Sequence, residues 1–184
     1  MKRIFISAIV ASIIFFAYQS LSWTLLPTHS NSVKYTNNQD TILHTLNKNL
    51  SEDGFYYVPS QKNGETMEEF NKNAEGKPFA IINYHKSLTN NMAVGMTLGF
   101  IFNFMGLLMA SIILFNLKTN LRFVSRWFLV MSIASIIFFM SLMTSWNWWH
   151  TPSHFLKGEI FDIIIGWGIT GIWLAWYSGR KSII

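Results

Sequence analysis

Four long apolar stretches dominate the pattern of hydrophobic and polar positions along this chain. They cover roughly residues 4–26, 92–115, 127–147 and 160–177. A helix needs about 20 residues to cross the hydrocarbon layer of a bilayer, and each stretch meets or approaches that length. The pattern therefore predicts an α-helical integral membrane protein with four transmembrane helices.

Between the first two stretches, residues 27–91 alternate short apolar runs with polar and turn-forming residues. The spacing of apolar positions predicts helices over 41–50 and 65–72, and aromatic or branched runs predict strands over 55–58 and 79–85. These elements predict a small α/β insert. Two strands alone are marginally stable in water, so the insert is expected to lean on a docking surface.

Composition supports this membrane assignment and removes several kinds of chemistry. Hydrophobic residues make up 51% of the chain and charged residues only 12%, against about 25% charged in ordinary soluble domains. Charge is expensive inside lipid, which accounts for the deficit. The chain has no cysteine, so disulfides, thiolate metal sites and thiol nucleophiles are excluded.

Basic residues gather at one set of span ends, and this distribution predicts the orientation. By the positive-inside rule, that side of the membrane is cytoplasmic. Both termini are then cytoplasmic at the inner membrane, and the net charge of +5 is a topology signal with no nucleic-acid partner implied. The residues concerned are Lys2, Arg3, Lys118, Arg122, Arg126, Arg180 and Lys181.

The first span has a second interpretation, a signal peptide cleaved after Ser22. The return of apolar residues over 21–26 favours a retained signal anchor.

The apolar stretches and the placement of basic residues together predict the organisation of the chain. The segments in order are transmembrane helix 1 (4–26), an extracytoplasmic α/β domain (27–91), helix 2 (92–115), a basic cytoplasmic loop (116–126), helix 3 (127–147), an outer Trp/His hairpin (148–159), helix 4 (160–177) and a cytoplasmic tail (178–184).

Small residues follow one face of the second span. Gly95, Gly99, Asn103 and Gly106 recur at steps of three and four, which lets another helix approach closely and lets an amide bond across the contact. The prediction is a helix-packing face, either within the chain or in a homo-oligomer. The fourth span carries Gly166, Gly168 and Gly171, which are also interpreted as sites of close packing.

A possible metal site lies at the outer end of the fourth span. His150 and His154, with Asp162 or Glu159, supply nitrogen and oxygen ligands suited to zinc, copper or iron. His29 and His85 could join them. Pro152 makes a regular helix through both hairpin histidines doubtful. The alternative is that the histidines are polar interface residues, and that Asp162 is a carboxylate favoured near a helix N-terminus.

Several short motifs carry a resemblance. They are Trp23…Pro27…His29, Gly54-Phe-Tyr-Tyr-Val-Pro59, the Trp146-Asn-Trp-Trp…Pro152 hairpin, and Asp162 followed by Gly166. With these motifs, most of the chain resembles an uncharacterised family of small bacterial four-span inner-membrane proteins. The resemblance implies four spans and an outward α/β insert, and it implies no activity and no catalytic residue.

The sequence contains no phosphate-binding loop, nucleophile elbow or zinc-protease helix. The first hypothesis is therefore a non-enzymatic binding or assembly component on the outer face of the cytoplasmic membrane. Its ligand would be a partner subunit, a lipid or an envelope component. The alternative is a metal- or cofactor-handling membrane protein using the outer histidine and aspartate residues, with the cofactor unknown. Metal analysis of the purified protein separates the two.

Overall fold

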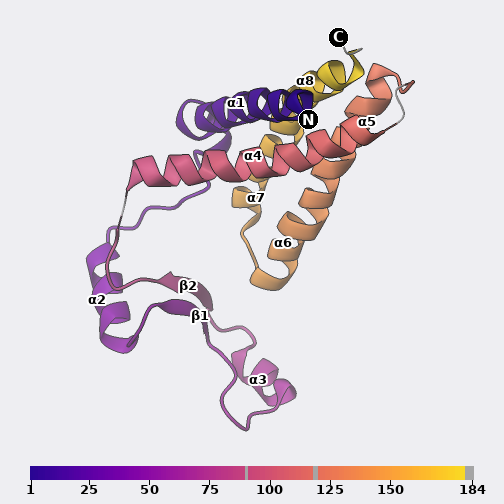
Figure 1. The fold of residues 1–184 in the computed structure, drawn as a ribbon. Helices are drawn as coiled ribbons and strands as arrows, with labels where there is room; N and C mark the ends of the chain where they lie inside the picture. The colour runs from indigo at the N-terminus through magenta and orange to yellow at the C-terminus, as the bar shows by residue number, and fades with distance from the viewer. Residues whose placement is uncertain (90, 118–119, 181–184) are drawn as a thin grey trace. The chain divides into compact units, whose positions relative to one another are not determined.

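The computed structural model describes residues 1–89, 91–117 and 120–180, and the chain divides into two compact units (Figure 1). Met1–Lys34 and the part of the chain from Asn91 onward form a helical unit. Tyr35–Asn90 form a smaller unit with a two-stranded sheet. The predicted combination of long helices with a small α/β insert is present.

Within the described ranges, four helices are long and apolar enough to cross a membrane, as predicted. The first is α1 (Lys2–Thr24), which is followed by the short 3-10 turn η1 (Pro27–His29), and the second is α4 (Met92–Asn116). Two π-helical segments interrupt the third and fourth. The third joins α5 (Phe123–Ile137), η2 (Phe138–Met143) and α6 (Thr144–Trp149), and the fourth joins α7 (Ser153–Phe161), η3 (Asp162–Gly166) and α8 (Trp167–Gly179).

The fourth helix begins earlier than its apolar stretch. Pro152 directly precedes its first residue, Ser153. Two positions before Pro152, His150 has a left-handed backbone with φ 49°, and α6 ends there. The first two turns of α7 are rich in polar residues, which hide this part of the helix from a hydropathy pattern. The outer hairpin is consequently a short turn between two helices.

The long helices pack antiparallel with small residues at their contacts. On α1, Ala8 and Ala11 are fully buried, and the Ser111 hydroxyl of α4 donates to Ser7 of α1 at 3.3 Å. Helix α8 lies against both α1 and α5. The Trp127 indole of α5 donates to the Gly168 carbonyl of α8 at 3.0 Å.

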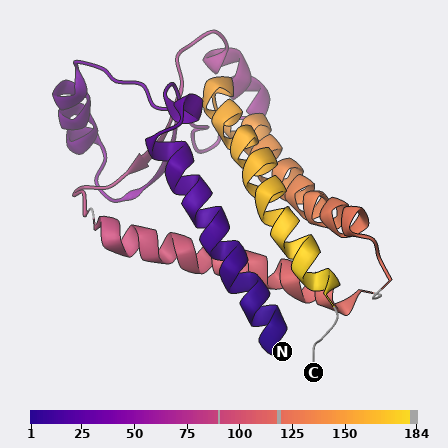
Figure 2. The same ribbon diagram turned by 90° about the horizontal axis from the view of Figure 1, so that it is seen from above.

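Arg3 joins the first and last spans at one end of the bundle. Its guanidinium donates to the backbone carbonyls of Tyr177, at 3.2 Å, and Arg180. A cation is favoured at a helix C-terminus, where carbonyls have no partner of their own. The start of α1 therefore lies beside the end of α8 (Figure 2). Of the basic residues used to predict orientation, Lys118 and Lys181 lie outside the described residues.

The smaller unit has the predicted order of helix, strand, helix and strand. Its elements are α2 (Gln39–Asn49), β1 (Gly54–Val58), α3 (Met67–Ala74) and β2 (Ala80–Tyr84). The strands pair antiparallel, with Gly54 opposite Tyr84 and Val58 opposite Ala80. Helix α3 starts with a capping box in which Thr66 and Glu69 bond each other's backbone amides.

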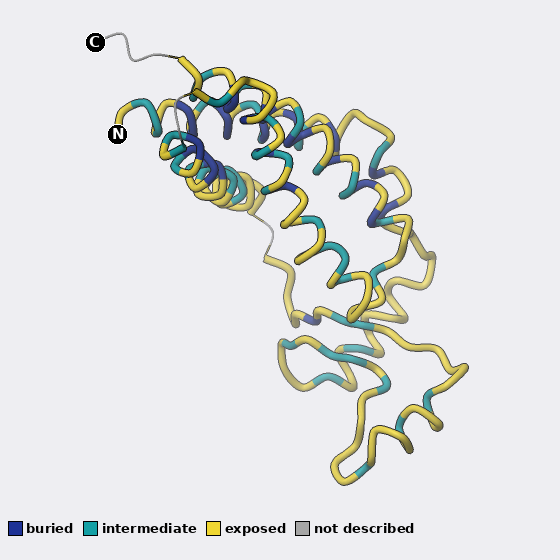
Figure 3. Tube along the Cα trace, turned by 90° about the vertical axis from the view of Figure 1, so that its right-hand side faces the viewer, coloured by how far each residue is buried: buried dark blue, intermediate teal, exposed yellow. Residues whose placement is uncertain are grey.

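This unit has very little core of its own. Among its described residues only Tyr84 is buried, and its hydroxyl donates to Asn47 of α2 at 2.9 Å. Figure 3 shows the smaller unit almost wholly exposed or half-buried, whereas buried positions concentrate on the long helices. Its exposed large apolar residues include Ile42, Leu43, Phe55, Val58, Met67 and Phe79.

The acidic residues of this unit stabilise its turns and its helix start. The backbone amide of Lys86 and the His85 ring hold the pKa of Asp53 below its ordinary value. The backbone amide and hydroxyl of Thr66 lower the pKa of Glu69 in the same way. These contacts give the carboxylates a local structural role.

Candidate functional site

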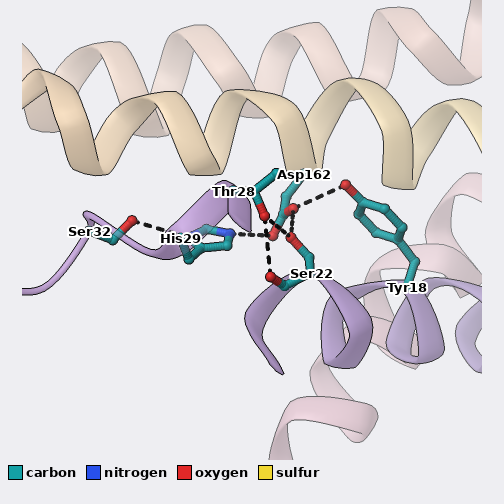
Figure 4. Close-up of polar contacts among 6 residues, drawn as sticks. All are labelled: Tyr18, Ser22, Thr28, His29, Ser32 and Asp162. Atoms are coloured by element: carbon teal, nitrogen blue, oxygen red, sulfur yellow. Dashed lines mark hydrogen bonds and ion pairs between the residues drawn. The ribbon is translucent and has the colours of Figure 1, made fainter. Parts of the chain in front are cut away.

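A buried carboxylate links the C-terminal end of α1 to the fourth span. Asp162 accepts hydrogen bonds from the Tyr18 hydroxyl at 3.1 Å, from the Ser22 hydroxyl, and from His29 Nε2 at 3.0 Å (Figure 4). All four side chains belong to residues no more than 9% exposed. A carboxylate can only accept, so these three donors suit its charged form.

His29 is fixed on every side of its ring. Its Nδ1 pairs with the Ser32 hydroxyl at 3.3 Å, and Trp23 stacks on its face with ring centroids 3.9 Å apart and planes 12° from parallel. Ser22 also shares a hydrogen bond of 3.0 Å with Thr28. The chain leaving α1 is therefore folded back onto the fourth span.

Two local sequence features make this arrangement possible. The turn η1 follows α1 closely, with Pro27 in its first turn, and returns His29 toward the helices. Gly158 on α7 leaves room for the ring, since a Cβ there would lie 2.6 Å from His29 Nδ1 and 3.1 Å from the Thr28 carbonyl. A side chain at 158 would displace His29.

A cavity of about 340 Å³ lies between the spans beside Asp162. This volume is within the range of small-molecule sites. All four long helices contribute to its wall. The lining residues are Phe15, Gln19, Trp23, Phe102, Asn103, Gly106, Leu107, Ile137, Ser141, Leu142, Glu159, Asp162, Ile163 and Trp167.

Both π-helical segments of the described chain border this cavity. Ser141 and Leu142 come from η2, and Asp162 and Ile163 come from η3. Single π-helical turns inside α-helices occur frequently at functional sites, because the extra residue redirects side chains and disturbs the backbone ladder. Their coincidence at one cavity marks it as the candidate binding site.

The polar groups of the wall differ in how they are satisfied. The Asn103 amide donates to Gln19 Oε1 at 2.6 Å, linking α4 to α1. Asp162 is fully engaged by its three donors. Glu159, one turn before Asp162, is half-buried and has no hydrogen-bond or ion-pair partner among the described residues.

The structure separates the residues of the metal hypothesis. His150 ends α6, whereas His154 lies exposed on α7, so Pro152 keeps them off a common helix. Asp162 bonds His29 in their place. Over the described ranges, no group of three or more histidine, aspartate or glutamate residues is placed to hold a metal ion. The geometry gives the metal hypothesis no support, and it stays a prediction.

The small-residue face of α4 has a mixed role within the chain. Asn103 bonds α1, and a Cβ at Gly99 would lie 3.9 Å from Phe16 of α1. At Gly95 and Gly106 a Cβ would meet no atom within 4 Å, and Gly106 lines the cavity. Packing of this face against a second copy remains a prediction.

The fold fits a multi-pass α-helical membrane protein, with four helices long and apolar enough to cross a membrane and a cavity between them that carries two carboxylates. No protein-family model, curated protein or solved structure matches the chain. The site therefore has to be interpreted from its own chemistry.

Sequence reasoning identified Asp162 and named His29 as a possible neighbour, but it missed Tyr18 and Ser22. Both are hidden in the apolar stretch of α1, where a hydroxyl changes hydropathy little. Their spacing of four residues places them on one helix face. That spacing, opposite an aspartate in another span, is the signal that could have found them.

Proposed function

We propose that this chain is a non-enzymatic binding or assembly component of the bacterial cytoplasmic membrane, and that it binds an amphiphilic molecule in the cavity between its spans. The ligand is a lipid or another envelope component. The observation that carries the proposal is the cavity itself, walled by all four long helices and bordered by both π-helical segments.

The chemistry of the wall supports binding over catalysis. Apolar residues such as Leu107, Ile137 and Leu142 suit an acyl or other hydrocarbon chain. Asp162 lines the cavity but is bonded to Tyr18, Ser22 and His29, and His29 is not among the residues that line it. Asp162 then acts as a fixed tie between α1 and the fourth span.

The exposed apolar residues of the smaller unit favour an assembly role beside ligand binding. A unit with one buried residue in its described part is stabilised when a partner covers those side chains. Native mass spectrometry of the protein purified from its own membranes tests both roles. A retained amphiphile would indicate ligand binding, and a stoichiometric protein partner would indicate assembly.

Filling the cavity tests ligand binding directly. Gly106→Leu adds a side chain at the cavity wall, and its Cβ would meet no other atom within 4 Å. We expect the variant to fold and to retain several-fold less amphiphile in native mass spectra, because the new side chain occupies the ligand's volume.

Gly95→Leu is the matched control. It adds the same side chain to the same helix, again into open space, and Gly95 does not line the cavity. Equal amphiphile retention in wild type and Gly106→Leu would falsify the cavity as the binding site. Equal loss in both variants would also count against it.

We propose further that both termini are cytoplasmic and that residues 35–90 face outward. The placement of basic residues supports this, together with the Arg3 contacts that hold the ends of α1 and α8 at one side. A reporter enzyme that is active only outside the cytoplasm should be active when it is inserted after Ser60. Cytosolic reporter activity at that position would reverse the orientation.

A further inference from the structure

The cavity has an electrostatic character that narrows its ligand. Its wall carries two carboxylates, Glu159 and Asp162, and among the described residues no lysine, arginine or histidine lines it. Asp162 is satisfied by three donors, while Glu159 has no such partner. A half-buried carboxylate without a partner is unfavourable unless a ligand or water supplies one.

Aromatic side chains make up much of the remaining wall. Phe15, Trp23, Phe102 and Trp167 line the cavity, and Phe15 and Trp167 pack edge to face with centroids 5.7 Å apart. Aromatic faces attract cations through their quadrupole, and such sites, when desolvated, recognise organic ammonium groups. A carboxylate beside aromatic rings is complementary to an organic cation.

Other ligand classes fit the wall less well. An anion would meet two carboxylates and no cationic lining residue in the described chain. A hard metal cation takes six or more oxygen ligands, and the wall is mostly hydrocarbon and aromatic. A purely apolar guest would leave the half-buried Glu159 carboxylate without a hydrogen-bond donor.

We infer that the ligand of this cavity carries an ammonium group, which pairs with Glu159 against the aromatic wall while its hydrocarbon part lies along Leu107, Ile137 and Leu142. The inference rests on the proposed function, because it names the chemical class of the amphiphile. The ammonium group belongs either to a phosphatidylethanolamine headgroup or to a free amphiphilic amine.

Binding titrations of the full chain in a non-ionic detergent, followed by native mass spectrometry, test this. The probes are phosphatidylethanolamine, phosphatidylglycerol with the same acyl chains, and dodecylamine. Wild type should bind one or both amine probes and bind phosphatidylglycerol more weakly. Glu159→Gln should weaken amine binding about tenfold, the loss expected when a hydrogen bond between charged groups is removed. Glu159→Asp should keep most of the affinity.

Phe102→Leu provides a second, charge-neutral variant. It removes an aromatic face from the wall and should weaken amine binding several-fold with phosphatidylglycerol unchanged. Binding of phosphatidylethanolamine alone identifies the headgroup as the source, and binding of dodecylamine alone identifies a free amine. Either result supports the inference.

Failure of the ammonium assignment and failure of the proposed function give different results in these titrations. If Gly106→Leu abolishes binding but Glu159→Gln and Phe102→Leu do not change it, the cavity binds an amphiphile and the ammonium assignment is overturned. Equal affinity of wild type for phosphatidylglycerol and phosphatidylethanolamine overturns it as well. If no probe is sensitive to Gly106→Leu, or none binds, the proposed function fails and the inference fails with it.

Discussion

Replacing Asp162 with alanine is expected to destabilise the helical unit more than any other single truncation at the site. The change leaves Tyr18, Ser22 and His29 as buried donors without their acceptor. Leaving a buried donor without its partner costs about 1–3 kcal/mol for each group. The thermal unfolding midpoint in a fixed detergent should fall by on the order of 10 °C.

Glu159→Ala is the control, because it removes a carboxylate one turn away on the same helix that has no partner in the described chain. Its midpoint should stay close to that of wild type in the absence of ligand. The double variant His29→Ala with Asp162→Ala should lose less stability than the sum of its two single changes, since both residues belong to one network. If the stability losses of the two single changes add strictly, or if Glu159→Ala lowers the midpoint as much as Asp162→Ala, Asp162 does not hold the network together.

The second large effect is expected at Gly166, where side chains of α1 lie close to the backbone of the fourth span. A Cβ at this position would lie 2.9 Å from both Phe15 Cε2 and Tyr18 Cδ1. Tyr18 cannot move freely, because its hydroxyl is bonded to Asp162. Gly166→Val should therefore overpack the contact and destabilise the protein by about 1–3 kcal/mol or more, measured as a lower unfolding midpoint.

Gly168→Val is matched to it in sequence, helix and side chain. At Gly168 a Cβ would meet no atom within 4 Å. The substitution there therefore changes only the intrinsic helix propensity, and glycine and valine differ in that propensity by a few tenths of a kcal/mol. The difference between the two variants isolates the steric contact. Similar midpoints for both would show that α1 does not pack against Gly166.

The long helices could be predicted from sequence because lipid imposes a simple rule on length and apolar character. The order of elements in the smaller unit was also correct, since turn-forming residues such as Gly54, Pro59 and Gly64 separate its short apolar runs. Hydropathy failed where helices continue into polar sequence. The first turns of α7 are polar on the surface, and only the structure shows that the helix starts at Ser153.

The site was less predictable because it depends on pairs of residues far apart in the chain. Asp162 stood out as an acid within a span, but its partners could be found only by packing α1 against the fourth span. Glycines illustrate the same point. A Cβ at Gly166 or Gly171 would meet neighbouring side chains, whereas a Cβ at Gly168 would meet none, although the three glycines cannot be told apart from the sequence alone.

Arg3 has a consequence for how the protein is made. The carbonyls that its guanidinium bonds lie 174 and 177 positions later in the sequence. The Asp162 partners on α1, Tyr18 and Ser22, likewise lie 144 and 140 positions before the aspartate. Until the fourth span has been synthesised, these polar side chains of α1 lack the partners that they have in the folded protein.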